Sequence, residues 1–281
     1  MPEIAEVETV RNTLKKRILN KTIKCVNVRY PKMIESNLED FKKILVGRSF
    51  LDIKRRGKWL IFDLGDYYLL SHLRMEGKYF IKSHEEELNK HEHVIITFID
   101  DTDLRYHDTR KFGRMNLIKK EDLVVAEEIA KQGLEPGDKN LTAKYLVDKF
   151  KKKRLPIKTV LLDQTIISGL GNIYANEVLF AAGLDPFKKA CDVSLEEASK
   201  IVDESNRIIK EAIKMGGTTI KSYTSSLGVT GRVQQYLCVH KREGMPCLRC
   251  GTTILNMKIN GRSTYFCPKC QGVIKTNEDN I

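Results

Sequence analysis

The segment ISGLGNIYANEVLFAAGLDP, residues 167–186, carries a clear helix signal. Apolar residues recur along it at helical spacing and share one face: Leu170, Tyr174, Val178 and Ala181. Gly183 and Pro186 then predict the end of this helix. A longer helix is predicted next, because Ser194 and Glu197 have the spacing of a capping box. The chain from about residue 121 onward therefore reads as helical.

Toward the N-terminus the pattern changes. A helix is predicted over residues 6–18, and short runs rich in β-branched and aromatic residues follow it. Seven such runs are predicted as strands: residues 22–28, 48–55, 58–64, 67–73, 78–82, 93–99 and 113–119. They indicate a β-rich domain that ends near residue 120, with the first helix packed against it. The pattern alone leaves open whether the strands form a Greek-key sandwich or a barrel.

Composition narrows the class of protein. The 281 residues carry a formal net charge of +12, which favours a polyanionic partner such as nucleic acid. No apolar run approaches the ~18 residues that span a membrane. The N-terminus is acidic, unlike a signal peptide. We therefore expect a cytoplasmic protein without membrane contact, although non-catalytic RNA-binding proteins share this composition.

Four of the seven cysteines form a compact pattern near the C-terminus. The pairs Cys247-x2-Cys250 and Cys267-x2-Cys270 are typical of a four-thiolate zinc site. Because protein ligands fill all four positions, the predicted zinc is structural and stabilises a module too short to bury a core of its own. Arg262 lies in a turn between the two pairs, where a guanidinium can meet phosphate.

The first residues, MPEIAEVET, have two interpretations. In the first, Pro2 begins a helix and the following acids offset the positive end of its dipole. In the second, removal of Met1 leaves Pro2 as a free secondary amine beside carboxylates. Glu8 is expected to be a solvated helix residue in either case.

Several segments together identify a family resemblance. In order they are MPEIAEVET (1–9), RRGKWL (55–60), HLRMEG (72–77), DTRKFG (108–113), DQTIISGLGNIYANEVL (163–179), GGTTIKSY (216–223) and the four-cysteine module. The chain resembles bacterial formamidopyrimidine-DNA glycosylases over nearly its whole length. That resemblance implies a bifunctional DNA glycosylase and AP lyase of base excision repair. Such an enzyme removes oxidised purines, including 8-oxoguanine and formamidopyrimidines, and then cuts the strand.

The implied fold is α+β and multidomain. The resemblance implies an N-terminal β-sandwich with an N-terminal helix, a helix–two-turn–helix domain and a C-terminal β-hairpin zinc finger with one structural Zn²⁺. We assign residues 1–120 to the catalytic sandwich, 121–140 to a linker, 141–235 to the helical DNA-binding domain with a lesion loop at 216–235, 236–271 to the finger and 272–281 to a polar tail. The expected partner is damaged double-stranded DNA, bound by a monomer in the cytoplasm and associated with the nucleoid.

The resemblance also implies roles for individual residues. Pro2 becomes the nucleophile, Glu3 the general acid, and Glu6 a supporting acid that orients groups around the nucleophile. Lys58 binds the phosphate beside the lesion and moves protons in β-elimination. Arg262 grips the flanking phosphates and assists δ-elimination.

Other residues are assigned to DNA binding. The gap left by a flipped base is filled by a wedge of Met75, Arg110 and Phe112. From the residues alone, Met75 and Phe112 would be ordinary core side chains. Arg110 also contacts DNA, and three further residues are expected to contact phosphates: His91, Arg154 and Asn172.

Two alternatives remain open from the sequence. An endonuclease VIII-like glycosylase for oxidised pyrimidines would have the same fold, but the wedge and the long 216–235 loop favour the purine enzyme. A non-catalytic zinc-finger nucleic-acid-binding protein explains the charge and the cysteines. It leaves Pro2, Glu3 and Lys58 together unexplained.

Overall fold

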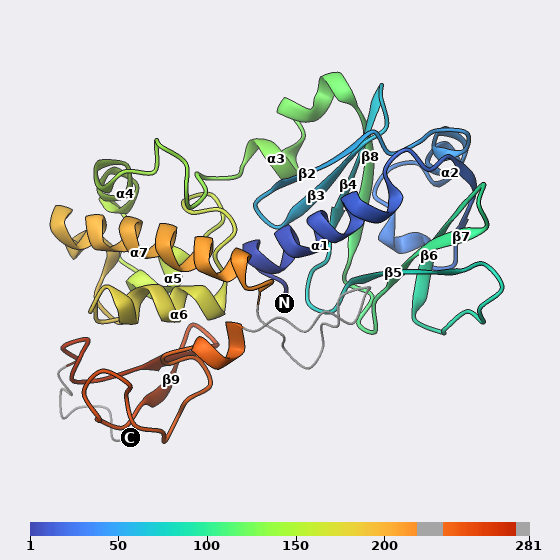
Figure 1. Cartoon of the computed structure of the whole chain (residues 1–281). Coiled ribbons are helices and arrows are strands. Elements are labelled where there is room, and N and C mark those ends of the chain that lie inside the picture. Colours follow the sequence, from blue (N-terminus) through green and yellow to red (C-terminus); the bar gives the residue numbers. More distant parts are fainter. Residues whose placement is uncertain (218–232, 274–281) are drawn as a thin grey trace. The chain divides into compact units, whose positions relative to one another are not determined.

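A computed structural model describes residues 1–217 and 233–273 of the chain (Figure 1). Its contacts divide the chain into two compact units. The N-terminal unit comprises Met1–Lys131 and Ala212–Gln234, and the C-terminal unit comprises Gln132–Glu211 and Gln235–Ile281. The finer division into sandwich, linker, helical domain, finger and tail stays a prediction, and most of the tail lies outside the described residues.

The N-terminal unit is built on two four-stranded antiparallel sheets. The first has the order β1 (Ile23–Val28), β6 (Glu92–Phe98), β7 (Thr102–His107) and β5 (Lys78–Ser83). The second has the order β2 (Asp52–Arg56), β3 (Trp59–Asp63), β4 (Tyr67–His72) and β8 (Arg114–Lys119). Both sheets contribute buried apolar side chains to one core, including Val94, Leu104, Phe62 and Leu69. The arrangement is therefore a sandwich, which the sequence pattern had left open.

Two helices complete this core. Helix α1 (Ile4–Ile18) packs against β2 and β3 (Figure 1) and buries the apolar positions that its periodicity predicts, among them Val7, Val10 and Leu14. Helix α2 (Leu38–Leu45) begins at Asn37, whose Oδ1 accepts from the backbone N–H groups of Glu39 and Asp40, each at 3.0 Å. Short 3₁₀ turns η1 (Pro31–Met33) and η2 (Lys120–Val124) and helix α3 (Glu127–Ala130) complete the set up to residue 131. The sequence analysis did not predict α2 or strand β7.

The C-terminal unit has a helical part and a small β-hairpin. Its helical elements are α4 (Ala143–Phe150), α5 (Ile157–Leu161), α6 (Asn172–Ala181), η3 (Ala190–Asp192) and α7 (Leu195–Lys214), whose last residues belong to the N-terminal unit. Every residue of α6 from 173 to 180 is buried, so this helix is central and not amphipathic with a single apolar face. The predicted capping box of α7 is confirmed, because Glu197 N–H donates to Ser194 Oγ at 3.1 Å and Ser194 N–H donates to Glu197 Oε2 at 2.8 Å.

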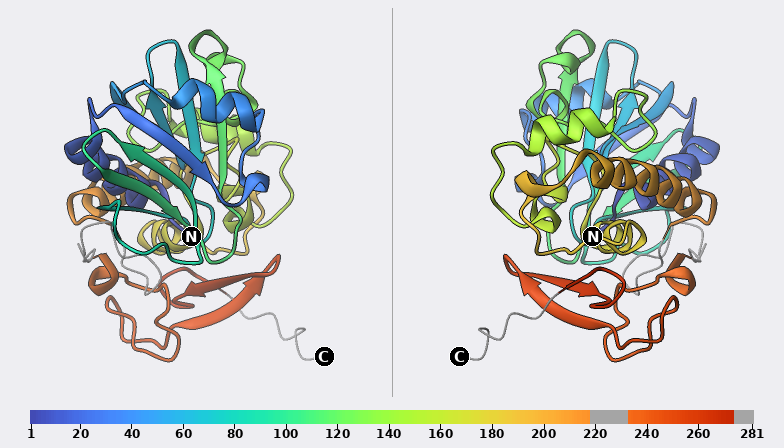
Figure 2. Two further views of the ribbon diagram at one scale, coloured as in Figure 1. Left: turned by 90° about the vertical axis from the view of Figure 1, so that its right-hand side faces the viewer. Right: turned by 90° about the vertical axis from the view of Figure 1, so that its left-hand side faces the viewer.

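The finger follows the 3₁₀ turn η4 (Val233–Tyr236). Strands β9 (Leu255–Ile259) and β10 (Arg262–Phe266) form an antiparallel hairpin, seen as paired arrows in Figure 2. Asn260 and Gly261 make the turn with positive φ angles of 46° and 73°, as a two-residue type I′ hairpin requires. The mixed α+β fold predicted from the sequence is confirmed.

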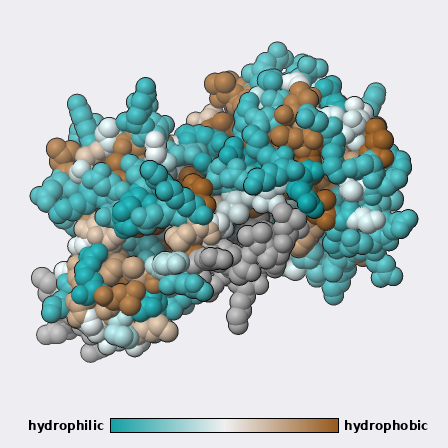
Figure 3. All heavy atoms as spheres, viewed as in Figure 1, coloured by the Kyte–Doolittle hydropathy of each residue, from teal (hydrophilic) through white to brown (hydrophobic). Residues whose placement is uncertain are grey.

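The face of the molecule that Figure 3 shows is mostly polar. In Figure 3 hydrophilic residues cover most of the visible face, and hydrophobic residues form small separate patches. Within residues 1–217 and 233–273, no helix is both long and apolar enough to cross a membrane.

Candidate functional site

The start of α1 buries two carboxylates. Glu3 is the N-cap residue and only 2% exposed, and Glu6 is 3% exposed. Glu6 Oε2 accepts from the Glu3 backbone N–H at 2.8 Å, and the Glu3 side chain accepts from the Glu6 backbone in return. This capping box fixes both acids directly after Pro2, which is itself buried. Glu6 therefore fixes the backbone at Glu3, and its role as a supporting acid stays a prediction.

Charged groups from other elements gather around the same terminus. Lys58 lies in the turn between β2 and β3 and is only 5% exposed. Burial is the largest cause that lowers the pKa of the Met1 amine below its usual 8.0. The carboxylates of Glu3, Glu6 and Glu76 act to raise that pKa, and the Lys58 ammonium lowers it further. The N-terminal amine, the acids and Lys58 thus share one electrostatic environment, while the catalytic roles of Pro2 and Lys58 stay predictions.

Glu8 differs from its prediction. Its side chain is only 14% exposed, and Oε2 accepts from Arg55 Nε at 2.9 Å. Arg55 Nη1 also donates to the carbonyl of Gly57 at 2.9 Å, in the turn that carries Lys58. Glu8 is therefore not a solvated helix residue, because it holds α1 to the Lys58 turn through Arg55.

Gly217, near the start of the predicted lesion loop, lies beside Glu6. A Cβ on Gly217 would come within 2.9 Å of Glu6 Oε1, so only glycine fits at this close approach. Val233 N–H donates to the Gly217 carbonyl at 3.3 Å, which joins the two ends. The rest of the predicted loop, residues 218–232, lies outside the described residues.

The predicted wedge residues lie on two loops of the N-terminal unit. Met75 follows β4 and is half-buried, whereas Arg110 and Phe112 lie between β7 and β8 and are exposed. Phe112 is 46% exposed, and the Arg110 guanidinium lies 4.7 Å from the centre of its ring. Core packing is therefore not the role of Phe112, whose exposed ring lies against the Arg110 guanidinium.

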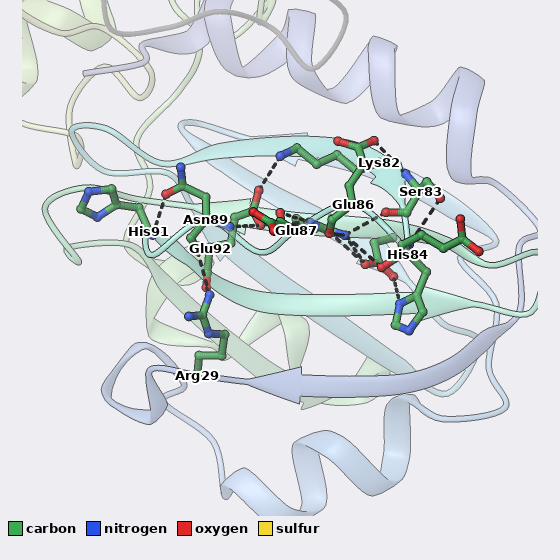
Figure 4. Close-up of polar contacts among 12 residues, drawn as sticks. Arg29, Lys82, Ser83, His84, Glu86, Glu87, Asn89, His91 and Glu92 are labelled. Atoms are coloured by element: carbon green, nitrogen blue, oxygen red, sulfur yellow. Dashed lines mark hydrogen bonds and ion pairs between the residues drawn. The ribbon is translucent and has the colours of Figure 1, made fainter.

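His91 precedes β6 at the end of a loop that a buried ion network holds in place (Figure 4). Arg105 on β7 is fully buried, and its guanidinium donates to Asp103, Glu92 and the carbonyls of Ser83, Glu86 and Glu87. Lys82 pairs with Glu92 at 2.9 Å. In Figure 4 the His91 ring points away from this network, and the network holds the loop that carries His91.

In the C-terminal unit a buried lysine joins the helices to the hairpin. Lys158 Nζ donates to Asn172 Oδ1 at 2.9 Å, to Thr264 Oγ1 at 3.0 Å and to the Ser263 carbonyl at 3.2 Å. Asn172 begins α6, and its Nδ2 also donates to the Ser263 carbonyl at 3.0 Å. These bonds fix the strand that begins with Arg262. The Arg262 side chain is exposed, and so is that of Arg154, which lies between α4 and α5.

The four predicted metal ligands converge. Their sulfur atoms all lie within 4.8 Å of one another, with 3.9 Å between Cys247 and Cys270 and 3.5 Å between Cys250 and Cys267. Zn–S bonds of about 2.3 Å in a tetrahedron require S–S edges of about 3.8 Å, so the four thiols fit one zinc ion. The backbone N–H groups of Arg249 and Cys270 donate to two of the sulfur atoms, each at 3.4 Å. The predicted structural zinc is thus supported by geometry.

The structure also contains site residues that the sequence analysis missed. Lys158, Arg105 and Asp108 are charged yet fully buried. For Lys158 the available signal was a charge inside the apolar run LPIKTVLL. No comparable signal singles out Arg105, because its partners come from the same charge-rich segment of residues 82–103.

Family models match three segments of the chain. Residues 1–115 match the formamidopyrimidine-DNA glycosylase N-terminal domain, residues 132–224 its H2TH domain, and residues 244–273 the zinc finger found in FPG and IleRS. The formamidopyrimidine-DNA glycosylase of Shouchella clausii (strain KSM-K16) is 46% identical over 273 residues, which cover 96% of this chain and 99% of the relative.

Solved structures agree. A Lactococcus lactis FPG mutant in complex with DNA containing Fapy-dG has a TM-score of 0.92 and 40% identity. The wild-type L. lactis protein in complex with DNA containing an oxidised pyrimidine has a TM-score of 0.90 and 40% identity. Both comparisons cover 96% of this chain and 99% of the other. The chain therefore belongs to the formamidopyrimidine-DNA glycosylase family, whose members are DNA glycosylases and AP lyases of base excision repair.

Proposed function

We propose that this protein excises oxidised purines from double-stranded DNA through an imine formed by the Pro2 amine, and then cuts the strand by β,δ-elimination. The observation that carries the proposal is the burial of Glu3, Glu6 and Lys58 around the N-terminal amine. Burying charged groups costs free energy, so their gathering around an amine of lowered pKa supports a functional site. The alternative function, a non-catalytic zinc-finger nucleic-acid-binding protein, does not explain why these charged groups are buried together.

The chemistry of the nucleophile requires removal of Met1. While Met1 is attached, the Pro2 nitrogen is an amide and cannot attack carbon. Once it is free, the secondary amine forms a bond to C1′, and the damaged base leaves with the electrons of the glycosidic bond. In this exchange the amine nitrogen loses its proton and the departing base gains one. A terminal amine has an ordinary pKa of about 7.7–8.0. Burial lowers the pKa of the Met1 amine. We expect the same surroundings to lower the pKa of the Pro2 amine once Met1 is removed, which favours its neutral, nucleophilic form near neutral pH.

Glu3 and Lys58 supply the proton transfers. Glu3 protonates the sugar ring oxygen, so that the ring opens and the proline nitrogen becomes an iminium. That cation accepts electrons as a proton leaves C2′ and the 3′-phosphate departs, and a second elimination expels the 5′-phosphate. Lys58 neutralises the phosphate beside the lesion and assists the first elimination, while Arg262 assists the second. Glu6 acts by positioning Glu3.

The proposed DNA contacts are made by exposed and half-buried side chains. Met75, Arg110 and Phe112 fill the gap in the stack, since Phe112 and Arg110 project from a fixed loop. Phosphate contacts come from His91, Arg154, Asn172 and Arg262. The net charge of +12 supports such binding through counterion release. We place the protein in the cytoplasm as a monomer associated with the nucleoid.

Oxidised purines are proposed as preferred substrates over oxidised pyrimidines. L. lactis complexes contain both Fapy-dG and oxidised-pyrimidine DNA, so the preference is one of rate. Single-turnover cleavage of matched duplexes carrying 8-oxoguanine, a formamidopyrimidine or an oxidised pyrimidine should give faster excision of the two purine lesions. A faster rate for the pyrimidine would favour the endonuclease VIII-like alternative.

The nucleophile is tested by trapping with borohydride, which reduces an imine to a stable protein–DNA crosslink. Two preparations are compared on an 8-oxoguanine duplex, one beginning at Pro2 and one retaining Met1, each verified by intact mass. Only the first should crosslink, and Pro2→Gly should retain part of the yield through its primary amine. Full trapping by the Met1-bearing protein would exclude Pro2, and no trapping by either would favour the non-catalytic alternative.

A further inference from the structure

The two wedge loops of the N-terminal unit share one buried support. The first loop joins β4 to β5 and carries Met75, and the second joins β7 to β8 and carries Arg110 and Phe112. Between them lie Tyr106, the penultimate residue of β7, and Asp108, the residue just after that strand. Both are buried.

Asp108 holds the second loop by its backbone. Oδ1 accepts from Arg110 N–H at 2.9 Å, and Oδ2 accepts from Phe112 N–H at 2.9 Å and from Gly113 N–H at 2.8 Å. One carboxylate thus accepts from three backbone N–H groups of a loop whose central residue, Lys111, has a positive φ of 57°. The backbone of the loop is fixed while the Arg110 and Phe112 side chains remain exposed.

Asp108 also joins this loop to the strand that begins after His91. Its backbone N–H donates to the His91 carbonyl at 3.0 Å, and its carbonyl pairs with His93 Nε2 at 2.8 Å. The position of Asp108 is therefore set from both sides, by the loop that it holds and by the neighbouring strand.

The Tyr106 side chain contacts the backbone of both wedge loops. A Cβ on Gly113 would lie 1.8 Å from the Tyr106 hydroxyl oxygen, and a Cβ on Gly77 would lie 2.2 Å from the same atom. The two glycines belong to different wedge loops, so one phenol oxygen lies against the backbone of both. On the first loop, His72 Nδ1 accepts from the N–H of Arg74, which has a positive φ of 52°.

We infer that Asp108 and Tyr106 are positioning residues that set the geometry of the wedge before DNA binds. The inference rests on the proposed wedge role of Met75, Arg110 and Phe112. Inserting side chains into a base stack requires the loops to keep their shape against the stack, and a loop ordered in advance loses less conformational entropy on binding. Asp108 holds the backbone of Arg110 and Phe112 in place before DNA binds. Tyr106 fixes the distance between their loop and the Met75 loop.

The inference can be tested through Arg110, by comparing the rates of excision with different bases opposite the lesion. Cytosine offers O2 and N3 as acceptors to a guanidinium, whereas adenine presents an amino donor beside N1. A positioned Arg110 should therefore favour 8-oxoguanine opposite cytosine over 8-oxoguanine opposite adenine. A loosened loop should lose this discrimination even though Arg110 itself is present.

The main experiment replaces Asp108 with asparagine, which leaves a single oxygen for three N–H donors. Asp108→Asn should reduce single-turnover excision opposite cytosine about 10- to 100-fold and bring the cytosine-to-adenine ratio close to one. Cleavage of a preformed abasic site in single-stranded DNA, where no base is flipped, should fall at least tenfold less. Asp101→Asn is the matched control, because Asp101 is exposed in the turn before β7 and should keep the wild-type ratio.

A double-mutant cycle separates positioning from general stability. In the Arg110→Ala/Phe112→Ala protein, adding Asp108→Asn should lower the single-turnover excision rate less than threefold. An equal loss in both backgrounds, or an equal loss on single-stranded abasic DNA, would overturn the inference. If the Arg110→Ala/Phe112→Ala protein itself keeps the wild-type ratio, the proposed wedge fails, which is a different result.

A second variant serves if Asp108→Asn does not fold. Tyr106→Phe keeps the ring and removes only the oxygen that touches both loops. A 2-aminopurine placed beside the lesion reports unstacking, and its stopped-flow fluorescence change should slow about threefold to tenfold in Tyr106→Phe. An unchanged fluorescence rate together with an unchanged cytosine-to-adenine ratio would exclude the role of Tyr106.

Discussion

Lys58 and Arg262 are both proposed phosphate ligands, yet they are held in different ways. Lys58 lies in a buried turn that Arg55 and Glu8 tie to α1, above a core drawn from two sheets and two helices. Arg262 is exposed on a hairpin whose apolar cluster contains little beyond Phe180, Val239, Ile254 and the ligand cysteines. The first cation depends on packing, and the second depends on a metal.

This difference predicts that removing the metal displaces Arg262 but leaves Lys58 in place. Packing and hydrogen bonds hold the sandwich site regardless of metal, so its residues should survive chelation. The finger has too few apolar side chains to fold without its ion. The single tryptophan of the chain, Trp59, is buried on β3 of the sandwich, so its fluorescence reports that region alone.

The largest expected effect is loss of the finger. Cys250→Ser should release zinc, which contributes on the order of 10–16 kcal/mol to the folding of such modules. Duplex affinity should then fall, while the urea midpoint followed by Trp59 fluorescence stays that of the wild type. Metal analysis and binding titrations check this, with Cys25→Ser as the control because Cys25 is exposed and lies outside the four-cysteine group. One retained zinc per chain with unchanged affinity would contradict the comparison.

A smaller effect, on DNA affinity and strand cleavage, distinguishes Lys58 from Arg262. Lys58→Ala and Arg262→Ala should each flatten the dependence of log affinity on log salt by about one, because each removes one phosphate contact. Strand cleavage by Lys58→Ala should fall about 100-fold beyond its loss of affinity, since proton transfer is lost as well.

Product analysis gives the corresponding test of Arg262. Arg262→Ala should accumulate the β-elimination product and slow only the second elimination. Equal losses of binding and cleavage in Lys58→Ala would refute its catalytic role. An unchanged product ratio in Arg262→Ala would refute the role in δ-elimination.

How much could be predicted from the sequence also differs between the regions. The zinc ligands follow from spacing alone, because tetrahedral coordination fixes which cysteine pairs can meet. Strand β7 was missed, since Asp103 and Arg105 look like turn or surface residues until the pairing of their charges inside the sheet is known. Glu8 was assigned to solvent for the same reason, as its partner Arg55 is 47 residues away in the sequence.

The roles of Pro2, Glu3 and Lys58 came from family resemblance and not from any local pattern. A lysine after a glycine or an acid near a helix start is ordinary in sequence. What sets these residues apart is burial around the terminus, which depends on the folded sandwich. Local periodicity predicts elements but does not predict long-range pairing of charges.

The smallest effect concerns the acid sensitivity of the sandwich. His72 ends β4, stacks edge-on against Trp59 at 4.8 Å and accepts the Arg74 N–H on Nδ1. Burial, aided by the positive charges of Arg74 and Lys58, lowers the pKa of His72 from 6.5 to about 3. Because the unfolded chain binds this proton more readily than the folded one, the contribution of His72 to stability is present above pH 6.5 and is lost as pH falls toward 3.

Between pH 7.5 and pH 5 this loss should amount to about 2 kcal/mol. His72→Asn keeps an acceptor for the Arg74 N–H but has no proton to gain, so the unfolding free energy of this variant should fall about 2 kcal/mol less over that interval. Urea melts followed by Trp59 fluorescence at the two pH values measure the difference, with His84→Asn as the control because His84 is 56% exposed. Parallel pH dependences for wild type and His72→Asn would mean that the sandwich is destabilised by acid through other groups.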